Sequence, residues 1–208
     1  MHGLSAHHEL ETVGDKILKP RVLIIGDSFV EGVGATGKQG WAQLLRDARD
    51  DDAEFTLSGI GGDTIAKILN RQSEFFGNSY SKVVLEVGLN DSRYRPSREE
   101  NEIPISNFGA GVGRFIELWR SNGSNVLLIG LTRVDETKTV PYKQDKVYRN
   151  ALIDIYDKCL AEVAISHGAR YLPVPKLNDT AEALDDGLHP SDIGHKRIRS
   201  AVEGAILG

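Results

Sequence analysis

The sequence predicts an α/β fold in which helices cover both faces of a parallel sheet, giving three layers. Short apolar segments alternate with longer segments of helical periodicity along the chain. Strands with near-continuous apolar runs, separated by helices, are typical of a sheet that is covered on both faces. The 208 residues, 40% of them hydrophobic, suffice for one core and are few for two. We expect a single domain over residues 20–208 after a loosely ordered N-terminal arm, residues 1–19.

Five apolar segments are expected to form the strands of the sheet. The first shows the pattern most clearly, because Val22, Leu23, Ile24 and Ile25 follow one another without a polar interruption. The five candidates cover residues 21–27, 54–58, 82–88, 125–131 and 169–173, and the pattern is weakest in the last. Such runs indicate strands that are buried on both sides.

Five helices are expected between and after these strands. They cover residues 41–49, 64–71, 106–122, 145–167 and 192–207. The fourth has the clearest periodicity, since its apolar residues from Tyr148 to Val163 recur at steps of three and four and include Cys159, which we place in the core. It is expected to end at His167, followed by Gly168, and the third helix ends in the same way before Gly123.

Polar or Gly-rich segments follow every predicted strand. They are Asp27 with Ser28, and residues 59–64, 88–92, 132–142 and 185–195. In open parallel sheets, ligands bind beyond the carboxyl ends of the strands, so these segments are expected at one edge. Together they contain a hydroxyl, a Gly-rich turn, an Asn, an Asp and a His. These groups meet the requirements of acyl transfer from an ester.

The segment after the first strand has a competing interpretation. Gly32, Gly34 and Gly37 have the G-x-G-x-x-G spacing of a dinucleotide-binding loop. That loop, however, places its first Gly directly at the strand end and needs an acidic residue after the second strand, and both features are missing. Val30 also stands where a G-x-S-x-G elbow requires Gly. We favour Ser28 as a nucleophile and keep a nucleotide-binding α/β module as the alternative.

Four blocks of the sequence resemble the SGNH or GDSL hydrolases. They are "GDSFVEG", "GGDT", "GLND" and "DGLHP", which follow in the family's order over residues 26–190. The resemblance implies a flavodoxin-like five-stranded sheet and hydrolysis of an ester or thioester without a metal or other cofactor. It implies Ser28 as nucleophile, Gly62 and Asn90 in the oxyanion hole, and Asp186 with His189 in the triad. Phe29 stands where the family name has Leu, and both residues are apolar.

The chemistry of these residues agrees with the implied roles. A serine hydroxyl is a poor nucleophile near neutral pH unless a base accepts its proton, which His189 can do. Asp186 can fix the imidazole tautomer and stabilise the imidazolium. The backbone N–H groups of Ser28 and Gly62 and the Asn90 amide can bind the oxyanion. Transfer of the acyl group to an alcohol or amine instead of water uses the same serine and stays open.

Each residue also has a plain structural interpretation. Ser28 can cap the following helix, Asn90 and Asp91 can form a capping turn, and His189 can lie on the surface, as we expect of His195. Asp63 and Thr64 are expected to cap a helix. The joint occurrence of four blocks at one sheet edge favours the catalytic interpretation.

Composition limits the partners and the substrate. A net charge of −5 argues against nucleic acid or an anionic membrane as the main partner, and one Cys excludes an internal disulfide. The N-terminal residues lack an apolar stretch and carry early acids, so we expect a cytoplasmic enzyme that acts on a small-molecule ester. Residues 91–104 and 132–142, expected at the mouth of the site, are rich in charge and poor in apolar side chains. This composition predicts a preference for short acyl groups.

Overall fold

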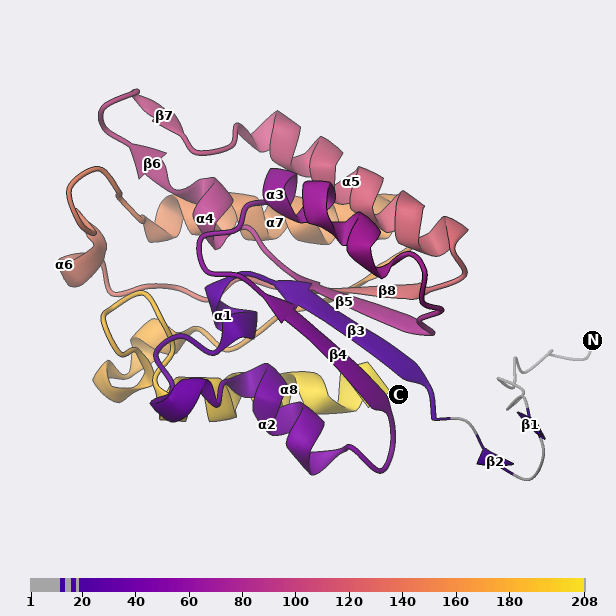
Figure 1. The fold of residues 1–208 in the computed structure, drawn as a ribbon. Coiled ribbons are helices and arrows are strands. Elements are labelled where there is room, and N and C mark those ends of the chain that lie inside the picture. Colours follow the sequence, from indigo (N-terminus) through magenta and orange to yellow (C-terminus); the bar gives the residue numbers. More distant parts are fainter. Residues whose placement is uncertain (1–11, 14–15, 18, 208) are drawn as a thin grey trace, which may run out of the picture.

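The computed structural model describes residues 12–13, 16–17 and 19–207, and a five-stranded parallel sheet lies at its centre (Figure 1). The sheet contains β3 (Arg21–Gly26), β4 (Glu54–Gly59), β5 (Lys82–Glu86), β8 (Asn125–Ile129) and β9 (Arg170–Leu172). Their order is β4-β3-β5-β8-β9, and every neighbouring pair is parallel. This is the flavodoxin-like order, as predicted. The chain changes direction across the sheet between β3 and β5.

Helices cover both faces of the sheet, which confirms the three-layer prediction. One face carries α2 (Trp41–Ala48) and α8 (Asp192–Leu207), and the other carries α3 (Ile65–Arg71), α5 (Ile105–Ser121) and α7 (Asn150–Ser166) (Figure 1). Single-turn helices α1 (Ser28–Glu31), α4 (Leu89–Ser92) and α6 (Glu136–Thr139) follow strands β3, β5 and β8. None of the helices in the described ranges is long and apolar enough to cross a membrane.

Short elements complete the described chain. Two antiparallel ribbons pair β1 (Thr12–Val13) with β2 (Lys16–Ile17) and β6 (Tyr94–Arg95) with β7 (Glu100–Asn101). The 3₁₀ helices are η1 (Thr36–Lys38), η2 (Gln72–Phe75), η3 (Leu177–Asp179) and η4 (Ala181–Ala183). Most of the N-terminal arm expected over residues 1–19 lies outside the described residues.

The core forms on both sides of the central strands. In β3 and β5 the apolar residues Val22–Ile25 and Val83–Leu85 are all buried, as the uninterrupted runs predict. Trp41 of α2 and Trp119 of α5 are buried against opposite faces. Burial of one Leu, Ile or Val side chain contributes roughly 1.5–3 kcal/mol, so these strands form a rigid base for the loops at their carboxyl ends.

Two sequence expectations about the helices are wrong. The fourth predicted helix begins at Asn150 and not at residue 145, because the preceding residues bond elsewhere: Tyr148 N–H donates to Thr139 O (3.1 Å) and Val147 N–H to Tyr94 O (3.0 Å). His195 is fully buried and not on the surface. Its Nδ1 accepts the Trp41 N–H (3.1 Å), and its Nε2 lies 3.1 Å from the Val33 carbonyl oxygen, so it joins α8 to α2.

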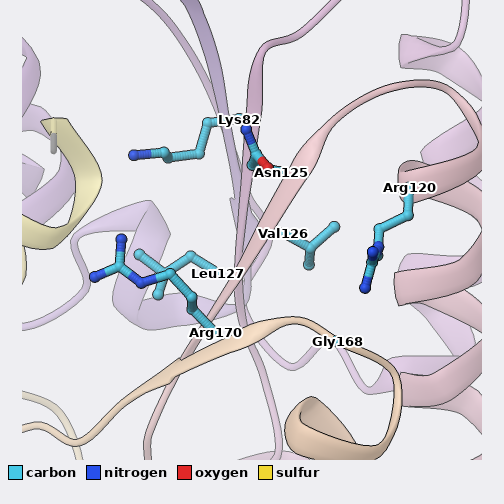
Figure 2. Close-up of a pocket in the computed structure, with 7 residues that line it drawn as sticks. All are labelled: Lys82, Arg120, Asn125, Val126, Leu127, Gly168 and Arg170. Atoms are coloured by element: carbon cyan, nitrogen blue, oxygen red, sulfur yellow. The ribbon is translucent and has the colours of Figure 1, made fainter. Parts of the chain in front are cut away.

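A pocket of about 280 Å³ opens at the amino ends of β5, β8 and β9 (Figure 2). Three basic side chains line it, but Lys82 and Arg170 point to one side while Arg120 lies on the other (Figure 2). Lys82 Nζ donates to Ile206 O (2.5 Å) and Arg120 Nη1 to His167 O (2.5 Å). These carbonyls end α8 and α7, where cations are favourable to the helix dipole. The pocket lies at the edge of the sheet opposite the predicted site, and its cations serve as helix caps.

Candidate active site

The predicted site residues meet where the sheet changes direction. Gly26 at the end of β3 pairs with Gly59 of β4 on one side and with Glu86 of β5 on the other. The segments that follow these three strands therefore leave the sheet at the same level, beside one another. A switch point of this kind is the usual ligand site of an open parallel sheet.

Ser28 is the first residue of α1 and is nearly buried, with 6% of its surface exposed. It does not cap the helix: Asp27 occupies the N-cap position, and its Oδ1 accepts the Phe29 N–H (3.0 Å). The plain interpretation of Ser28 as a cap is therefore wrong. Among the described residues, its hydroxyl and its backbone N–H have no hydrogen-bond partner, so both are free to act on a ligand.

The glycine turn after β4 faces Ser28. A Cβ added at Gly61 would lie 3.8 Å from Ser28 Cβ, and the Gly61 N–H donates to Glu31 Oε2 (2.7 Å). Gly62 has a left-handed φ of +81°, which favours glycine, and its N–H has no acceptor within the described part of the chain. Two backbone donors, from Ser28 and Gly62, are thus available at this edge.

Asn90 lies in α4 with its amide held from both ends. Its Nδ2 donates to Asp27 Oδ2 (2.9 Å) and to Asp63 O (3.1 Å). Its Oδ1 accepts from Tyr148 Oη (3.3 Å) and Arg93 Nη1 (3.4 Å), and these two donors fix which end is oxygen. Both amide hydrogens are already used, so a bond to an oxyanion would be shared with one of these acceptors.

The next residue, Asp91, also lies in α4, and its side chain caps the N-terminal end of helix α3. Its Oδ1 accepts the Ile65 N–H (2.9 Å), whereas Thr64 at the N-cap position makes no side-chain bond. Asp63 instead pairs with Arg71 (2.7 Å). The expectation that the side chains of Asp63 and Thr64 cap this helix is therefore wrong, because the carboxyl group of Asp91 in α4 takes the role.

Asp186 and His189 form a close pair before α8. Their Oδ2 and Nδ1 atoms are 2.9 Å apart, and Asp186 Oδ1 accepts the backbone N–H groups of Leu188 and His189, both at 2.9 Å. Burial pushes the pKa of Asp186 up, but its bonds to His189 and to the backbone prevail and hold this pKa well below its usual range. Asp186 is thus an anion suited to hold an imidazole in one tautomer.

The His189 loop packs against the Ser28 segment. The Phe29 and His189 ring centroids are 6.3 Å apart, and a Cβ added at Gly34 would lie 3.1 Å from His189 Cβ. No hydrogen bond between the Ser28 hydroxyl and the imidazole occurs in the described structure. The fold thus brings the two residues to one edge, and the proton-transfer contact itself is longer than a hydrogen bond. Such contacts commonly shorten when substrate binds.

Two of the three glycines in the dinucleotide-like pattern, Gly32 and Gly34, have structural roles. A Cβ added at Gly32 would lie 2.4 Å from Lys38 O, and one at Gly34 would lie 2.2 Å from Pro190 O. These two glycines allow close packing of the protein on itself, which leaves them no room to approach a phosphate. The geometry therefore gives no support to the nucleotide-binding alternative.

Three buried carboxyl groups underlie the site. The sequence analysis names Asp27 and Asp91 without predicting their burial, and it does not name Glu86. Burial raises the pKa of Asp27 to about 6 and that of Asp91 to about 7. Burial, together with the adjacent Asp27, raises the pKa of Glu86 well above its ordinary value. The signal for Glu86 is an acid that ends the strand "KVVLE" directly after three apolar residues.

Sequence reasoning also missed the contacts that Tyr142 and Tyr148 make with the site from the loop between α6 and α7. Tyr142 Oη donates to Asp186 Oδ2 (2.8 Å), and Tyr148 Oη donates to Asn90. Charged residues predicted at the mouth pair with acids: Arg93 with Glu102 (3.0 Å) and Arg133 with Asp154 (2.6 Å).

Comparisons with known proteins identify the family and the fold of this chain. The family model described as GDSL-like lipase/acylhydrolase matches residues 24–197. An arylesterase of Vibrio mimicus is 26% identical over 174 residues, covering 82% of this chain and 80% of that protein. The isoamyl acetate-hydrolyzing esterase 1 homolog of Rattus norvegicus is 28% identical over 206 residues, covering 90% and 82%. The crystal structure of esterase EstA from Pseudoalteromonas sp., inhibited by monoethylphosphonate, superposes with a TM-score of 0.71 at 16% identity, covering 90% of this chain and 97% of that chain. At that identity, the likeness to EstA concerns the fold.

Proposed function

The chain belongs to the GDSL-like lipase/acylhydrolase family and is an esterase, and from this premise we propose that it cleaves small carboxylic esters through an acyl-Ser28 intermediate. The observation that carries the proposal is the Asp186–His189 pair, 2.9 Å apart, at the sheet edge where Ser28 and two free backbone N–H groups lie. Residues 20–208 act as one catalytic domain in this proposal.

The first half of the reaction acylates the serine. Ser28 Oγ attacks the ester carbonyl carbon while His189 Nε2 takes its proton. The tetrahedral oxyanion binds the N–H groups of Ser28 and Gly62, and Asn90 Nδ2 shares one of its hydrogens. Collapse of this intermediate breaks the bond to the alcohol, which leaves with the proton from His189.

The second half releases the acid. Water gives a proton to His189 as it attacks the acyl-Ser28 carbonyl, and the proton returns to Ser28 Oγ when the carboxylic acid departs. Asp186 stays ionised and stabilises the imidazolium in both halves. One well-placed oxyanion donor is typically worth about 3–4 kcal/mol of transition-state stabilisation.

The substrate that fits best has a short acyl group on a small alcohol. Two supports are the paired charges at the mouth and the rat relative, whose name refers to isoamyl acetate, an ester with a two-carbon acyl group. The cytoplasmic location expected from the sequence is part of the same proposal, and cell fractionation would test it.

A fluorophosphonate probe tests the nucleophile directly, because it reacts with activated serines. We expect one adduct by intact-mass spectrometry in the native protein and in Ser106→Ala, a control at an exposed serine. In Ser28→Ala we expect no adduct and no esterase activity, with thermal unfolding unchanged. An adduct that persists in Ser28→Ala would overturn the assignment. Release of the free acid in the absence of an added alcohol separates hydrolysis from acyl transfer.

A further inference from the structure

We propose that Tyr142 is a positioning residue that completes the hydrogen-bond shell of the Asp186 carboxylate and so sets the strength with which Asp186 stabilises the protonated His189. This inference rests on the proposed function, in which His189 is the general base. Tyr142 lies 44 residues before Asp186 in the chain, in the loop between α6 and α7. Its hydroxyl donates to Asp186 Oδ2 (2.8 Å), the same oxygen that lies 2.9 Å from His189 Nδ1.

The carboxylate of Asp186 uses its full capacity to accept hydrogen bonds. An ionised carboxylate offers about four lone-pair sites. The backbone N–H groups of Leu188 and His189 occupy Oδ1, and the imidazole and Tyr142 occupy Oδ2. Three of these donors belong to the tight turn that carries Asp186 itself. In the described structure, only Tyr142 reaches the carboxylate from another part of the fold.

Packing holds the Tyr142 ring in place between two site residues. Its side chain lies edge-to-face against Tyr148, with centroids 5.7 Å apart, and against His189, at 6.4 Å. Its backbone N–H donates to Lys146 O (2.6 Å), and only 9% of the residue is exposed. Tyr148 donates in turn to Asn90. This loop thus contacts both Asp186, the partner of the general base, and Asn90, the amide proposed to bind the oxyanion.

In the hydrogen bond between Tyr142 and Asp186, the tyrosine is the donor and the carboxylate is the acceptor. Burial, and then the bond to Asp186, raise the pKa of the Tyr142 phenol, so it stays protonated over the working range of an esterase. The pKa of Asp186 is held low, so this group stays ionised. The contact is therefore a phenol O–H donating to a carboxylate, which is a charge-assisted hydrogen bond and stronger than a neutral one.

This bond draws negative charge from the oxygen that faces the imidazole. Without the phenol hydroxyl, Oδ2 would direct its charge at His189 alone and would stabilise the protonated imidazole more strongly. The other ionisable groups near this cluster would remain in place. Asp27, Glu31 and His195 lie near His189, and Lys143, Tyr148 and Asp185 lie near Tyr142. Lys138 packs against Gly187 of the same turn. A change seen after loss of the hydroxyl would thus report the Tyr142 bond.

The test compares Tyr142→Phe with Tyr171→Phe. Tyr171 is a matched control, because its hydroxyl also donates to a carboxylate, Asp157 (2.7 Å), in a half-buried contact away from the site. In Tyr142→Phe we expect kcat to fall roughly tenfold with KM unchanged, because the carboxylate that orients His189 loses the hydrogen bond that fixes it from outside its own turn. The acid limb of the kcat/KM profile should move to higher pH by roughly half a unit. Tyr171→Phe should leave both quantities unchanged.

A second variant keeps the ring and tests the opposite direction. Difluorotyrosine at position 142 is a stronger donor, so we expect the acid limb to move to lower pH. This variant also tests the proposal if Tyr142→Phe fails to fold, which a thermal unfolding measurement would show. A fall in activity without a shift of the acid limb in either variant would overturn the proposal, because a merely structural residue behaves in that way. If Ser28→Ala is inactive but the acid limb of the Tyr142 variants does not move, Tyr142 lacks this role and the proposed function stands. If Ser28→Ala stays active, the proposed function itself fails.

Discussion

At the scale of single residues, Glu31 holds the glycine turn that faces Ser28. Its Oε2 accepts the Gly61 N–H (2.7 Å), and its Oε1 forms an ion pair with Lys38. The bond to Lys38 prevails over burial and lowers the pKa of Glu31, so the acceptor is ionised at neutral pH. Gly61 precedes Gly62, whose N–H is a proposed oxyanion donor. We therefore expect Glu31 to help hold this donor in position.

Replacement of Glu31 by Leu is expected to lower kcat more than it changes KM. The reason is that a displaced Gly62 N–H would lose contact with charge that develops only in the transition state. Loss of a whole oxyanion donor costs about 10²–10³ in kcat, so we expect a reduction of roughly 10- to 100-fold. Lys38→Gln is the control, since it removes the ion pair but keeps the acceptor. Steady-state kinetics with equal losses in the two variants would contradict this role.

The proposed catalytic residues could be predicted because each lies in a short motif at a strand end. Ser28, Gly62, Asn90 and His189 are recognisable from their neighbours in the sequence. Glu31 and Tyr142 are not, since their partners lie 30 and 44 residues away. Local spacing holds no information about a contact that only the folded chain creates.

At the scale of elements, the beginning of α3 depends on a carboxyl group from α4. Asp91 Oδ1 accepts the Ile65 N–H, whereas its Oδ2 is buried without a partner in the described structure. Burial raises the pKa of Asp91 to about 7, against an ordinary value near 4. The folded protein therefore binds a proton between these two pH values that the unfolded chain releases. This group's contribution to stability is full below about pH 4 and is lost as the pH rises through about 7.

The Asp91→Asn variant is expected to reduce this pH dependence. An amide mimics the neutral acid, keeps the acceptor for Ile65 and does not titrate. The free energy of unfolding of the native protein should fall between about pH 4 and 7 more steeply than that of the variant, as measured by urea denaturation. Asp51→Asn, at an exposed carboxylate, should follow the native curve. Some slope should persist in Asp91→Asn because the pKa of Asp27 is also raised, to about 6. Parallel curves for Asp91→Asn and the native protein would refute the assignment.

Helix ends show where sequence reasoning at this scale succeeds. The ends of α5 and α7 were predictable, since Gly123 and Gly168 follow them with positive φ. The beginning of α7 was not, because Val147 and Tyr148, the two apolar residues in 145–149, suit either a helix or a buried loop. The backbone N–H groups of Val147 and Tyr148 bond to Tyr94 and Thr139, and these bonds hold the segment as a loop. Tertiary contacts thus prevail over periodicity where the two conflict.

At the scale of the whole molecule, strand order decides where the site forms. The apolar runs predict which segments are strands, and the alternation with helices predicts that they are parallel. Their spatial order does not follow from the runs, and it came from the family resemblance. Once β3 lies between β4 and β5, the three loops that carry Ser28, Gly62 and Asn90 must meet. The position of the site is therefore a consequence of topology.

The mouth of the site is expected to limit the acyl chain. The apolar residues of its loops are used elsewhere: Val134 is fully buried, and Tyr142 contacts Asp186 and His189. The neighbouring charges pair with acids, as Arg93 does with Glu102. Ile60, beside the glycine turn, is 49% exposed and is the large apolar side chain of that loop. A single exposed side chain offers contact to a short acyl group but does not form a groove.

We therefore expect kcat/KM to be highest for acetyl or butyryl esters and to fall for longer chains. A CH₂ group that leaves water contributes about 0.8 kcal/mol, or about fourfold in kcat/KM, and only if apolar surface is present to cover it. Nitrophenyl esters of graded acyl length provide the measurement, and a series of acetates with graded alcohols serves as the control for leaving-group size. Ile60→Ser should lower kcat/KM for the butyryl ester more than for the acetyl ester. A value that rises about fourfold per CH₂ through the long-chain esters would instead require an extended apolar groove at this edge and a lipid or long-chain thioester as substrate.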